Sequence, residues 1–391
     1  MKFSARTSFP LAPNRLSARL AELTLAGRPL VDLTLSNPTR AGLAYAPDLL
    51  APLGHPRGLV YEPAAFGLAS AREAVARASG VPASQVLLTA STSEAYALLF
   101  KLLADPGDDV LAPRPTYPLF DYLAALEGVR LGAYDLAWDG AWHVDLASVE
   151  AALTPRTRAV LVVSPHNPTG AWLKRRELDA LAGLCAARGL ALIVDEVFAE
   201  YPLFEPREPR VATVAGEARC LTFVLGGLSK ARALPQVKLA WTVASGPPEA
   251  LLPALDRLDL VADTYLSPST PAMAALPELV ARTEVRDAIR ARCVQNVQTL
   301  QSVRSAAAPW DVLAPEAGWS AVLRVPAARS EEAWALALLD AGVVVHPGFF
   351  FDFPRGAHLV VSLLPEPAVF AEGARRLARV LSREPLRTAQ R

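Results

Sequence analysis

The sequence predicts an α/β protein: a three-layer large domain with a mostly parallel sheet, joined to a smaller α+β domain formed by the C-terminal part and the N-terminal segment. The 391 residues, 52% of them hydrophobic, exceed what one small core needs. Short continuous apolar runs alternate with helical patterns through the middle of the chain, which is typical of parallel strands buried on both faces. From about residue 268, a long, charged, amphipathic segment indicates a second region.

The elements of the large domain are predicted from apolar runs that end at turn-forming residues. Helical spacing predicts helices at 93–104 and 178–188, which stop at Pro106-Gly107 and Gly189. Each predicted strand is a short apolar run. The predicted strands cover residues 85–89, 109–112, 159–163, 190–194, 220–225 and 238–244.

The small domain is expected to begin with a helix at 283–305 and to end with a helix at 368–381. The first forty residues are expected to belong to this domain or to form an arm on a partner subunit. Strands are predicted in the small domain at 321–325, 343–346 and 359–363. The predicted division is 1–44 for the N-terminal arm, 45–268 for the large domain and 269–391 for the small domain.

Charge and cysteine content exclude several classes of function. The formal net charge is zero and basic residues are spread along the chain, so no surface for nucleic acid or an anionic membrane is expected. The three cysteines are far apart and form no CxxC motif, which argues against a disulfide framework or a zinc site. No secretory signal and no apolar stretch of about 20 residues are recognised, so a cytoplasmic protein is expected.

Polar residues follow several predicted strands, where open α/β sheets bind their ligands. Each has an ordinary interpretation, such as a helix cap, a turn residue or a surface lysine. These residues are Ser91, Tyr117, Asn167, Asp195 and Lys230.

The same residues also fit a chemical site. Lys230, in the turn GGLSK (226–230), becomes a nucleophile toward an aldehyde if its surroundings lower its pKa. Asp195 ends a buried strand, where a carboxylate is costly without a partner such as a pyridinium nitrogen. Asn167, in SPHNPTG (164–170), has an amide for a phenolate oxygen. The turn at 89–94, TASTSE, has N–H groups and hydroxyls that suit a phosphate at a helix start.

In their order and spacing, these motifs resemble the class I/II aminotransferase family of the aspartate aminotransferase superfamily, the fold-type I pyridoxal-phosphate enzymes. Asn167 precedes Asp195 by 28 residues, and Asp195 precedes Lys230 by 35. The resemblance extends from about Leu33 to Leu381. It implies pyridoxal 5'-phosphate as cofactor, held by Lys230 as a Schiff base, and transfer of an amino group between an L-amino acid and a 2-oxo acid.

The resemblance also implies a role for each matching residue. Lys230, Asp195 and Tyr117 would form the catalytic set: Lys230 moves the proton, Asp195 pairs with the pyridine nitrogen, and Tyr117 stacks on the ring. Asn167 would contact the phenolate oxygen. The phosphate would be held by Ser91, Thr92 and Lys238, and by Tyr61 of the neighbouring subunit. A homodimer with shared active sites is therefore implied.

The chain departs from the family pattern at four positions. Ser91 stands where the phosphate turn usually has Gly, Phe198 where a Tyr usually contacts the phenolate oxygen, and Lys238 where an Arg usually contacts the phosphate. Lysine keeps the charge of arginine but loses its bidentate fork. The fourth departure is Val360, which replaces the Arg that usually clamps the substrate α-carboxylate.

The loss of that arginine means that another group holds the carboxylate or that the substrate is unusual. Candidates from the sequence are Arg40 and Asn37, in the turn SNPTR (36–40), and Arg324 and Arg355. Arg355 follows the aromatic run FFFDFP (349–354), part of which could line an apolar substrate pocket.

Two further functions remain open at this stage. The same fold and cofactor also serve lyases that eliminate a β C–S bond, and decarboxylases. An aminotransferase-like domain can also act as a non-catalytic effector sensor, but the chain shows no basic DNA-binding segment, and Lys230, Asp195 and Asn167 are all retained. Alanine, aromatic and acidic amino donors all remain possible.

Overall fold

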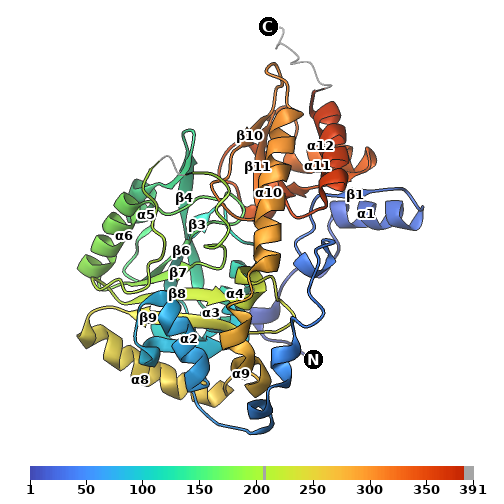
Figure 1. Cartoon of the computed structure of the whole chain (residues 1–391). Coiled ribbons are helices and arrows are strands. Elements are labelled where there is room, and N and C mark those ends of the chain that lie inside the picture. The colour runs from blue at the N-terminus through green and yellow to red at the C-terminus, as the bar shows by residue number, and fades with distance from the viewer. Residues whose placement is uncertain (206–207, 383–391) are drawn as a thin grey trace.

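A computed structural model describes residues 1–205 and 208–382. Its centre is an eight-stranded sheet (Figure 1), in which the strands follow the order β2-β9-β8-β7-β6-β3-β4-β5. The strands of this sheet are β2 (Val86–Thr89), β3 (Asp109–Arg114), β4 (Arg130–Trp138), β5 (Trp142–Val144), β6 (Thr157–Val163), β7 (Ala191–Asp195), β8 (Thr222–Gly227) and β9 (Ala240–Ser245).

The five strands β8, β7, β6, β3 and β4 run parallel to one another, while β9 pairs antiparallel with both β2 and β8, and β5 pairs antiparallel with β4. The predicted mostly parallel sheet is therefore confirmed. Because the carboxyl ends of β6, β7 and β8 lie together, the loops that follow them meet at one edge of the sheet.

Helices cover both faces of the sheet, and the side chains of each strand alternate between them. In β6, for example, Val160 and Val162 join one core cluster, and Ala159 and Leu161 join the other. The second cluster includes buried residues of α3, α4 and α8, and the first includes those of α2, α5 and α6. These helices are α2 (Ala69–Ser79), α3 (Thr92–Leu103), α4 (Leu119–Glu127), α5 (Leu146–Ala152), α6 (Arg175–Arg188) and α8 (Pro248–Tyr265).

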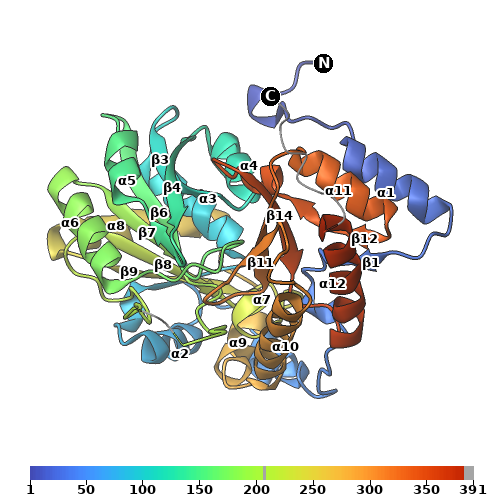
Figure 2. The same ribbon diagram turned by 90° about the horizontal axis from the view of Figure 1, so that it is seen from above.

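A second, smaller region contains an antiparallel sheet in the order β10-β11-β14-β13. Figure 2 shows β11 and β14 between the large sheet and the helices α11 and α12. Its elements are α10 (Glu284–Ser302), β10 (Asp311–Leu313), β11 (Ser320–Val325), α11 (Glu331–Asp340), β12 (Val343–Val344), β13 (His346–Pro347), β14 (Ala357–Ser362) and α12 (Pro367–Ser382).

The N-terminal segment packs on this smaller region. Strand β1 (Val31–Asp32) pairs in parallel with β12, and α1 (Arg15–Leu25) contacts α11. Leu33 is fully buried there and its carbonyl accepts a hydrogen bond from the N–H of Ser362 at 2.7 Å. Both ends of the chain therefore build one small α+β region, as the sequence predicts.

Two further helices pack against elements of the large region. Helix α7 (Leu228–Ala231) follows β8 directly, and α9 (Thr270–Leu279) contacts α2 of the large region. Residues 270–279 thus lie with the large region, although the predicted boundary at residue 268 assigns them to the small domain. The exact division of the chain stays a prediction. In the described part of the chain, no helix has both the length and the hydropathy of a membrane span.

Candidate active site

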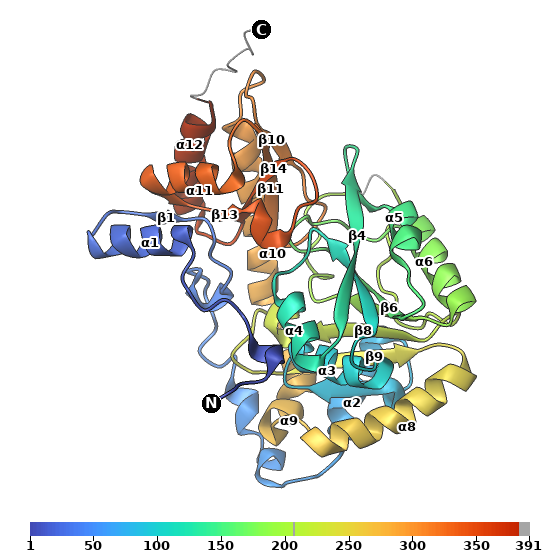
Figure 3. The same ribbon diagram turned by 180° about the vertical axis from the view of Figure 1, so that it is seen from behind.

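A cavity of about 450 Å³ lies between the two regions, whose relative placement is seen from behind in Figure 3. The large region contributes residues at the ends of β6, β7 and β8, the small region contributes residues of β11, β13 and β14, and the N-terminal segment adds Thr34 and Ser36. Chemically reactive or polar lining residues include Ser91, Thr92, Tyr117, Asn167, Asp195, Ser229, Lys230, Ser320, His346 and Ser362.

Lys230 lies on α7, immediately after the Gly226-Gly227 pair that ends β8. A side chain at Gly226 would collide with the indole of Trp241, with 2.4 Å to its Nε1, and one at Gly227 would lie 3.0 Å from the Cβ of Ala240. The two glycines therefore let β8 approach β9 closely and keep the turn compact. This geometry places the Lys230 side chain in the cavity.

The environment of Lys230 favours an uncharged amine. Burial lowers the pKa of its ammonium group, while the charge of Asp195 opposes this shift. The Nζ atom lies 5.1 Å from the ring centroid of Trp319 and 5.8 Å from that of Phe198. A lysine whose pKa is lowered in this way has a larger fraction of its nucleophilic form near neutral pH.

Asp195 ends β7 and is buried, with two donors to its carboxylate. The hydroxyl of Tyr96 donates to Oδ2 at 2.8 Å, and the N–H of Val197 donates to Oδ1 at 3.0 Å. Burial raises the pKa of Asp195, whereas these two hydrogen bonds and the charge of Lys230 lower it. The carboxylate therefore suits a cationic N–H group in the cavity.

Asn167 enters the cavity from the loop after β6. Its Oδ1 accepts a hydrogen bond from the Ser320 hydroxyl at 3.4 Å, and its amide nitrogen has no partner among the described residues. The next strand end on the other side carries Tyr117, whose ring contacts Phe120 edge to face at 5.9 Å between centroids. Asn167 thus has a free donor, and Tyr117 offers an aromatic surface to a bound ring.

The start of α3, which carries the predicted phosphate motif, lines part of the cavity. Ser91 caps this helix: its hydroxyl oxygen accepts a hydrogen bond from the N–H of Glu94 at 3.1 Å. Ser91, Thr92, Ser93 and Ser229 all line the cavity. Hydroxyls and N–H groups at the start of a 12-residue helix suit an anion such as a phosphate.

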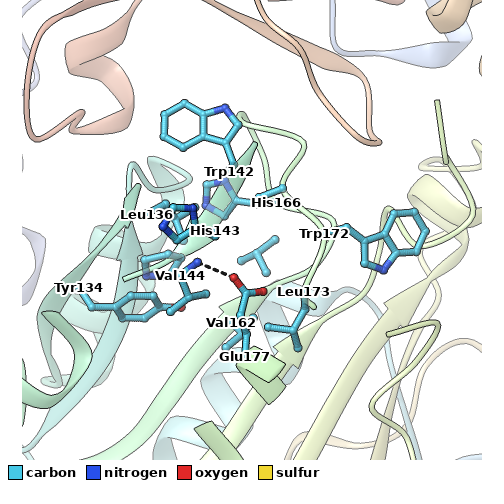
Figure 4. Close-up of a pocket in the computed structure, with 13 residues that line it drawn as sticks. Tyr134, Leu136, Trp142, His143, Val144, Val162, His166, Trp172, Leu173 and Glu177 are labelled. Carbon is cyan, nitrogen blue, oxygen red and sulfur yellow. Dashed lines mark hydrogen bonds between the residues drawn. The ribbon is translucent and has the colours of Figure 1, made fainter. Parts of the chain in front are cut away.

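A second pocket, of about 10 Å³, is lined by His166 of the loop after β6 (Figure 4). Trp142, His166 and Glu177 line it, and the N–H of Val144 donates to Glu177 at 2.9 Å. The Nδ1 of His166 shares a hydrogen bond with the Thr169 hydroxyl at 2.9 Å. His166 Nε2 and Trp142 Nε1 are buried without a partner among the described residues. His166 therefore supports the loop and does not line the large cavity.

Six of the predicted site residues do not line the large cavity within the described part of this one chain. Tyr61, Arg40 and Lys238 are exposed, and Lys238 has a left-handed backbone with φ +58°. Asn37 uses its side-chain oxygen to accept hydrogen bonds from the N–H and hydroxyl of Thr39. Arg355 lines a separate cavity of about 380 Å³, beside Arg324 and His358.

Tyr96, Trp319 and His346 are among the residues of the site that were not predicted from the sequence. Tyr96 lies on α3 next to Asp195, Trp319 precedes β11, and His346 begins β13. Of these three, only Tyr96 could have been found from the sequence, because it follows the predicted phosphate turn on the same helix. Trp319 and His346 reach the cavity through the packing of the small region, which no local motif encodes.

A lysine, a buried carboxylate and a helix start that together line a cavity at the strand ends of an α/β sheet define a site for pyridoxal phosphate. The comparison with known families agrees: residues 59–368 match the family Aminotransferase class I and II. The chain belongs to this family. The aminotransferase fold, a large α/β sheet domain with a second small region, is thereby confirmed.

The chain is similar to several characterised members. It is 32% identical to an arginine–pyruvate transaminase of Pseudomonas aeruginosa, over 76% of this chain and 75% of that protein. It is 28% identical to an aspartate aminotransferase of Streptomyces avermitilis, over 94% of this chain and 93% of that protein. The match to an alanine aminotransferase of Mycobacterium tuberculosis, 30% identical, spans 66% of this chain and 61% of that protein.

A solved structure of a double mutant of the Thermus thermophilus aspartate aminotransferase superposes with a TM-score of 0.81 and 26% identity, covering 97% of this chain and all of that one. The protein is a pyridoxal-phosphate-dependent aminotransferase, and it moves amino groups between amino acids and oxo acids. The cavity fits this cofactor, because an amine, a carboxylate and a helix start line one space.

Proposed function

We propose that this aminotransferase uses Lys230 to hold its cofactor and to move the proton at the substrate Cα. The observation that carries the proposal is the shared cavity of Lys230, Asp195 and the α3 start. Pyridoxal phosphate, when bound, supplies an aldehyde and an electron-withdrawing ring that makes the Cα proton acidic. The buried, weakly basic amine of Lys230 takes up and returns that proton because its pKa is lowered.

The neighbouring residues orient the cofactor in this proposal. Asp195, hydrogen-bonded by Tyr96, accepts from a protonated ring nitrogen, and Asn167 donates its free amide N–H to the phenolate oxygen. Tyr117 stacks on the ring. The phosphate binds at the start of α3. Its proposed contacts are Ser91, Thr92, Ser229 and Lys238 of the same chain, together with Tyr61 of the partner subunit.

We further propose that the amino donor has an apolar or aromatic side chain. The cavity walls include Tyr117, Phe198, Trp319, Phe350 and Phe351. No arginine and no lysine other than Lys230 lines the cavity in the described part of this chain. Among the groups of this one chain, a second carboxylate on the substrate would therefore be desolvated without a cationic partner, which is costly.

A homodimer in the cytoplasm is the proposed state of the enzyme. Consecutive apolar residues Leu59, Val60 and Tyr61 are 90%, 57% and 68% exposed in the single chain. Such a cluster is typical of a surface that another subunit covers. In the dimer, Tyr61 is the residue proposed to reach the partner's phosphate site, and Asn37 and Arg40 are proposed to lie near the substrate.

The test is an absorption spectrum of purified enzyme with pyridoxal phosphate, to which L-amino acids are added one at a time. We expect a visible band that moves to the near ultraviolet with phenylalanine or leucine and far less with aspartate. Lys230→Ala should lose the visible band, and Lys101→Ala, which changes an exposed lysine paired with Glu127, should keep it. Release of pyruvate and ammonia from a donor, in place of amino transfer, would favour a lyase.

A further inference from the structure

The cavity has no arginine for the substrate carboxylate, and Val360 occupies the position where the family usually has one. In the antiparallel pair of β13 and β14, the residue directly opposite Val360 is His346. Side chains of directly opposed residues lie on the same face of a sheet, with their Cβ atoms roughly 5 Å apart. Val360 and His346 both line the cavity.

The imidazole of His346 is positioned by aromatic contacts. Its ring centroid lies 5.9 Å from those of Phe350 and Phe351, in tilted and edge-on arrangements. Neither ring nitrogen has a hydrogen-bond partner among the described residues. A half-buried imidazole that is fixed by packing and faces a cavity has its full hydrogen-bonding capacity available to a ligand.

The other polar groups on this wall are already occupied. The hydroxyl of Ser362 donates to the carbonyl of Leu35 and accepts a hydrogen bond from the N–H of Leu364. The hydroxyl of Ser320 donates to Asn167. His346 is therefore the group on β11, β13 and β14 that lines the cavity, can carry a positive charge and has no competing partner.

We propose that His346 recognises the carboxylate of the amino acid and of the 2-oxo acid, in the place of the missing arginine clamp. This inference rests on the proposed function and adds the residue that selects a carboxylate substrate. An imidazolium gives one charged N–H···O contact where a guanidinium gives two, so the clamp is weaker and depends on pH.

The pH dependence follows from the charges around His346. Burial lowers the pKa of its imidazole, and the charge of Asp32 on β1 opposes this. A bound carboxylate raises the pKa again, so binding takes up a proton. Affinity is then greatest below the pKa of the free enzyme and is lost as the pH rises through the pKa of the complex. The other titratable groups of the adjacent elements and the cavity include His358, Glu331, Glu332, Asp340, Asp195, Tyr117 and Lys230.

The experiment measures binding of 3-phenylpropionate and of its neutral isostere 3-phenylpropanamide to the holoenzyme by isothermal titration calorimetry. The variants are His346→Gln, which keeps a donor but carries no charge, and His346→Arg, which is charged at every pH. His143→Gln, on β5 and outside the large cavity, is the matched control. Buffers with different ionisation enthalpies report the proton uptake.

We expect His346→Gln to weaken 3-phenylpropionate about 10-fold or more, the size of a lost charged hydrogen bond, and to leave the amide nearly unchanged. It should also abolish the proton uptake. His346→Arg should restore affinity without pH dependence, and His143→Gln should behave as wild type. The same split is expected in steady state, as a raised KM for both substrates with a smaller change in kcat.

An equal loss for the acid and the amide, or unchanged proton uptake in His346→Gln, overturns the inference. Failure of the inference alone is distinguishable from failure of the proposed function. In the first case wild type still shifts its visible band with an amino acid, while His346→Gln weakens the acid and the amide equally or keeps the proton uptake. In the second case the wild-type band does not respond to any amino acid.

Discussion

At the scale of single residues, the chemistry of the site depends on the hydrogen bonds that a buried carboxylate receives. Asp195 loses hydration at the end of β7, and burial alone raises its pKa. The hydroxyl of Tyr96 and the N–H of Val197 replace two lost water contacts. Burial and the negative charge of Asp195 in turn raise the pKa of Tyr96, so this phenol remains a donor.

Replacing Tyr96 by Phe should therefore weaken catalysis without removing the cofactor. The variant leaves Asp195 with one donor fewer, raises its pKa further and weakens its contact with a cationic ring nitrogen. We expect kcat/KM to fall about 10- to 100-fold, as for a hydrogen bond to a charged group. Tyr134→Phe is the control, because its hydroxyl donates to the carbonyl of Leu161 and does not line the large cavity. Equal activity losses in the two variants would contradict the role of Tyr96.

His166 gives a prediction for stability against pH. Burial lowers the pKa of its imidazole from 6.5 to about 3, so the folded protein holds it neutral. The unfolded chain protonates it below pH 6.5, so the stabilisation is present above that pH and is lost as the pH falls toward 3. Between pH 6.5 and 5 the loss should be about 2 kcal/mol. Urea unfolding of wild type and His166→Gln measures it, and the variant should show a flatter profile over this range.

At the scale of elements, the loop before β11 of the small region packs against the large region. The segment 314–319 precedes β11 and ends in Trp319, which lines the cavity. The N–H groups of Glu316 and Ala317 donate to the carbonyl of Gly170, and Lys174 Nζ contacts Glu316 Oε2 at 2.5 Å. Gly170 is required there, since its φ is +70° and a Cβ would lie 2.5 Å from the carbonyl oxygen of Ala317.

The Lys174→Met variant tests this connection. It removes the cation of a buried pair, since the side chains of Lys174 and Glu316 are 3% and 16% exposed. Glu316 then lacks a charged partner, and we expect a loss of about 3–5 kcal/mol in unfolding free energy. The exposed pair of Arg176 and Glu208, whose side chains are 61% and 48% exposed, is the comparison, and Arg176→Met should cost less than about 1 kcal/mol. A small effect for Lys174→Met in urea titrations would show that the pair does not hold the loop.

The elements that could be predicted from the sequence are those with long or strongly apolar runs. The strands of the large sheet that follow from such runs lie within about two residues of their predicted ends, for example β7 at 191–195 against 190–194. Helix α8 was not predicted. It contains Pro253, and a proline inside a segment disfavours a helix when only neighbouring residues are considered. The predicted strand 343–346 is divided between β12 and β13, because Val345 lies between two different pairings.

In the candidate site too, residues that carry a local motif could be predicted, and a residue placed by packing could not. Lys230, Asp195, Asn167, Tyr117 and the α3 start could be predicted, because each follows a strand end and carries a local motif. The carboxylate-binding residue could not be predicted. It depends on which residue of a two-residue strand pairs with Val360, and this register is set by the packing of the small region.

At the scale of the whole molecule, the dimer proposal has its own test. Sedimentation should give twice the 41.7 kDa mass of the chain. If Tyr61 serves the partner's site, Tyr61→Ala should weaken cofactor binding, and mixing it with Lys230→Ala should regenerate one intact site in each mixed dimer. The mixture should then exceed the activity of both parents. Tyr265→Ala, which changes another exposed tyrosine, is the control. A monomer by sedimentation, or no gain on mixing, would exclude a shared site.

The joining of both chain ends in one region has a consequence for biosynthesis. Backbone groups of Leu33 and Leu35 bond to Ser362, and β1 pairs with β12, so one wall of the cavity joins segments that lie as far as 327 residues apart in the chain. The large sheet, by contrast, is complete once β9 has emerged. A nascent chain arrested before residue 343 would therefore expose Lys230 and Asp195 to water, and lasting capture of the cofactor is expected only after the segment 343–362 has been made and has folded.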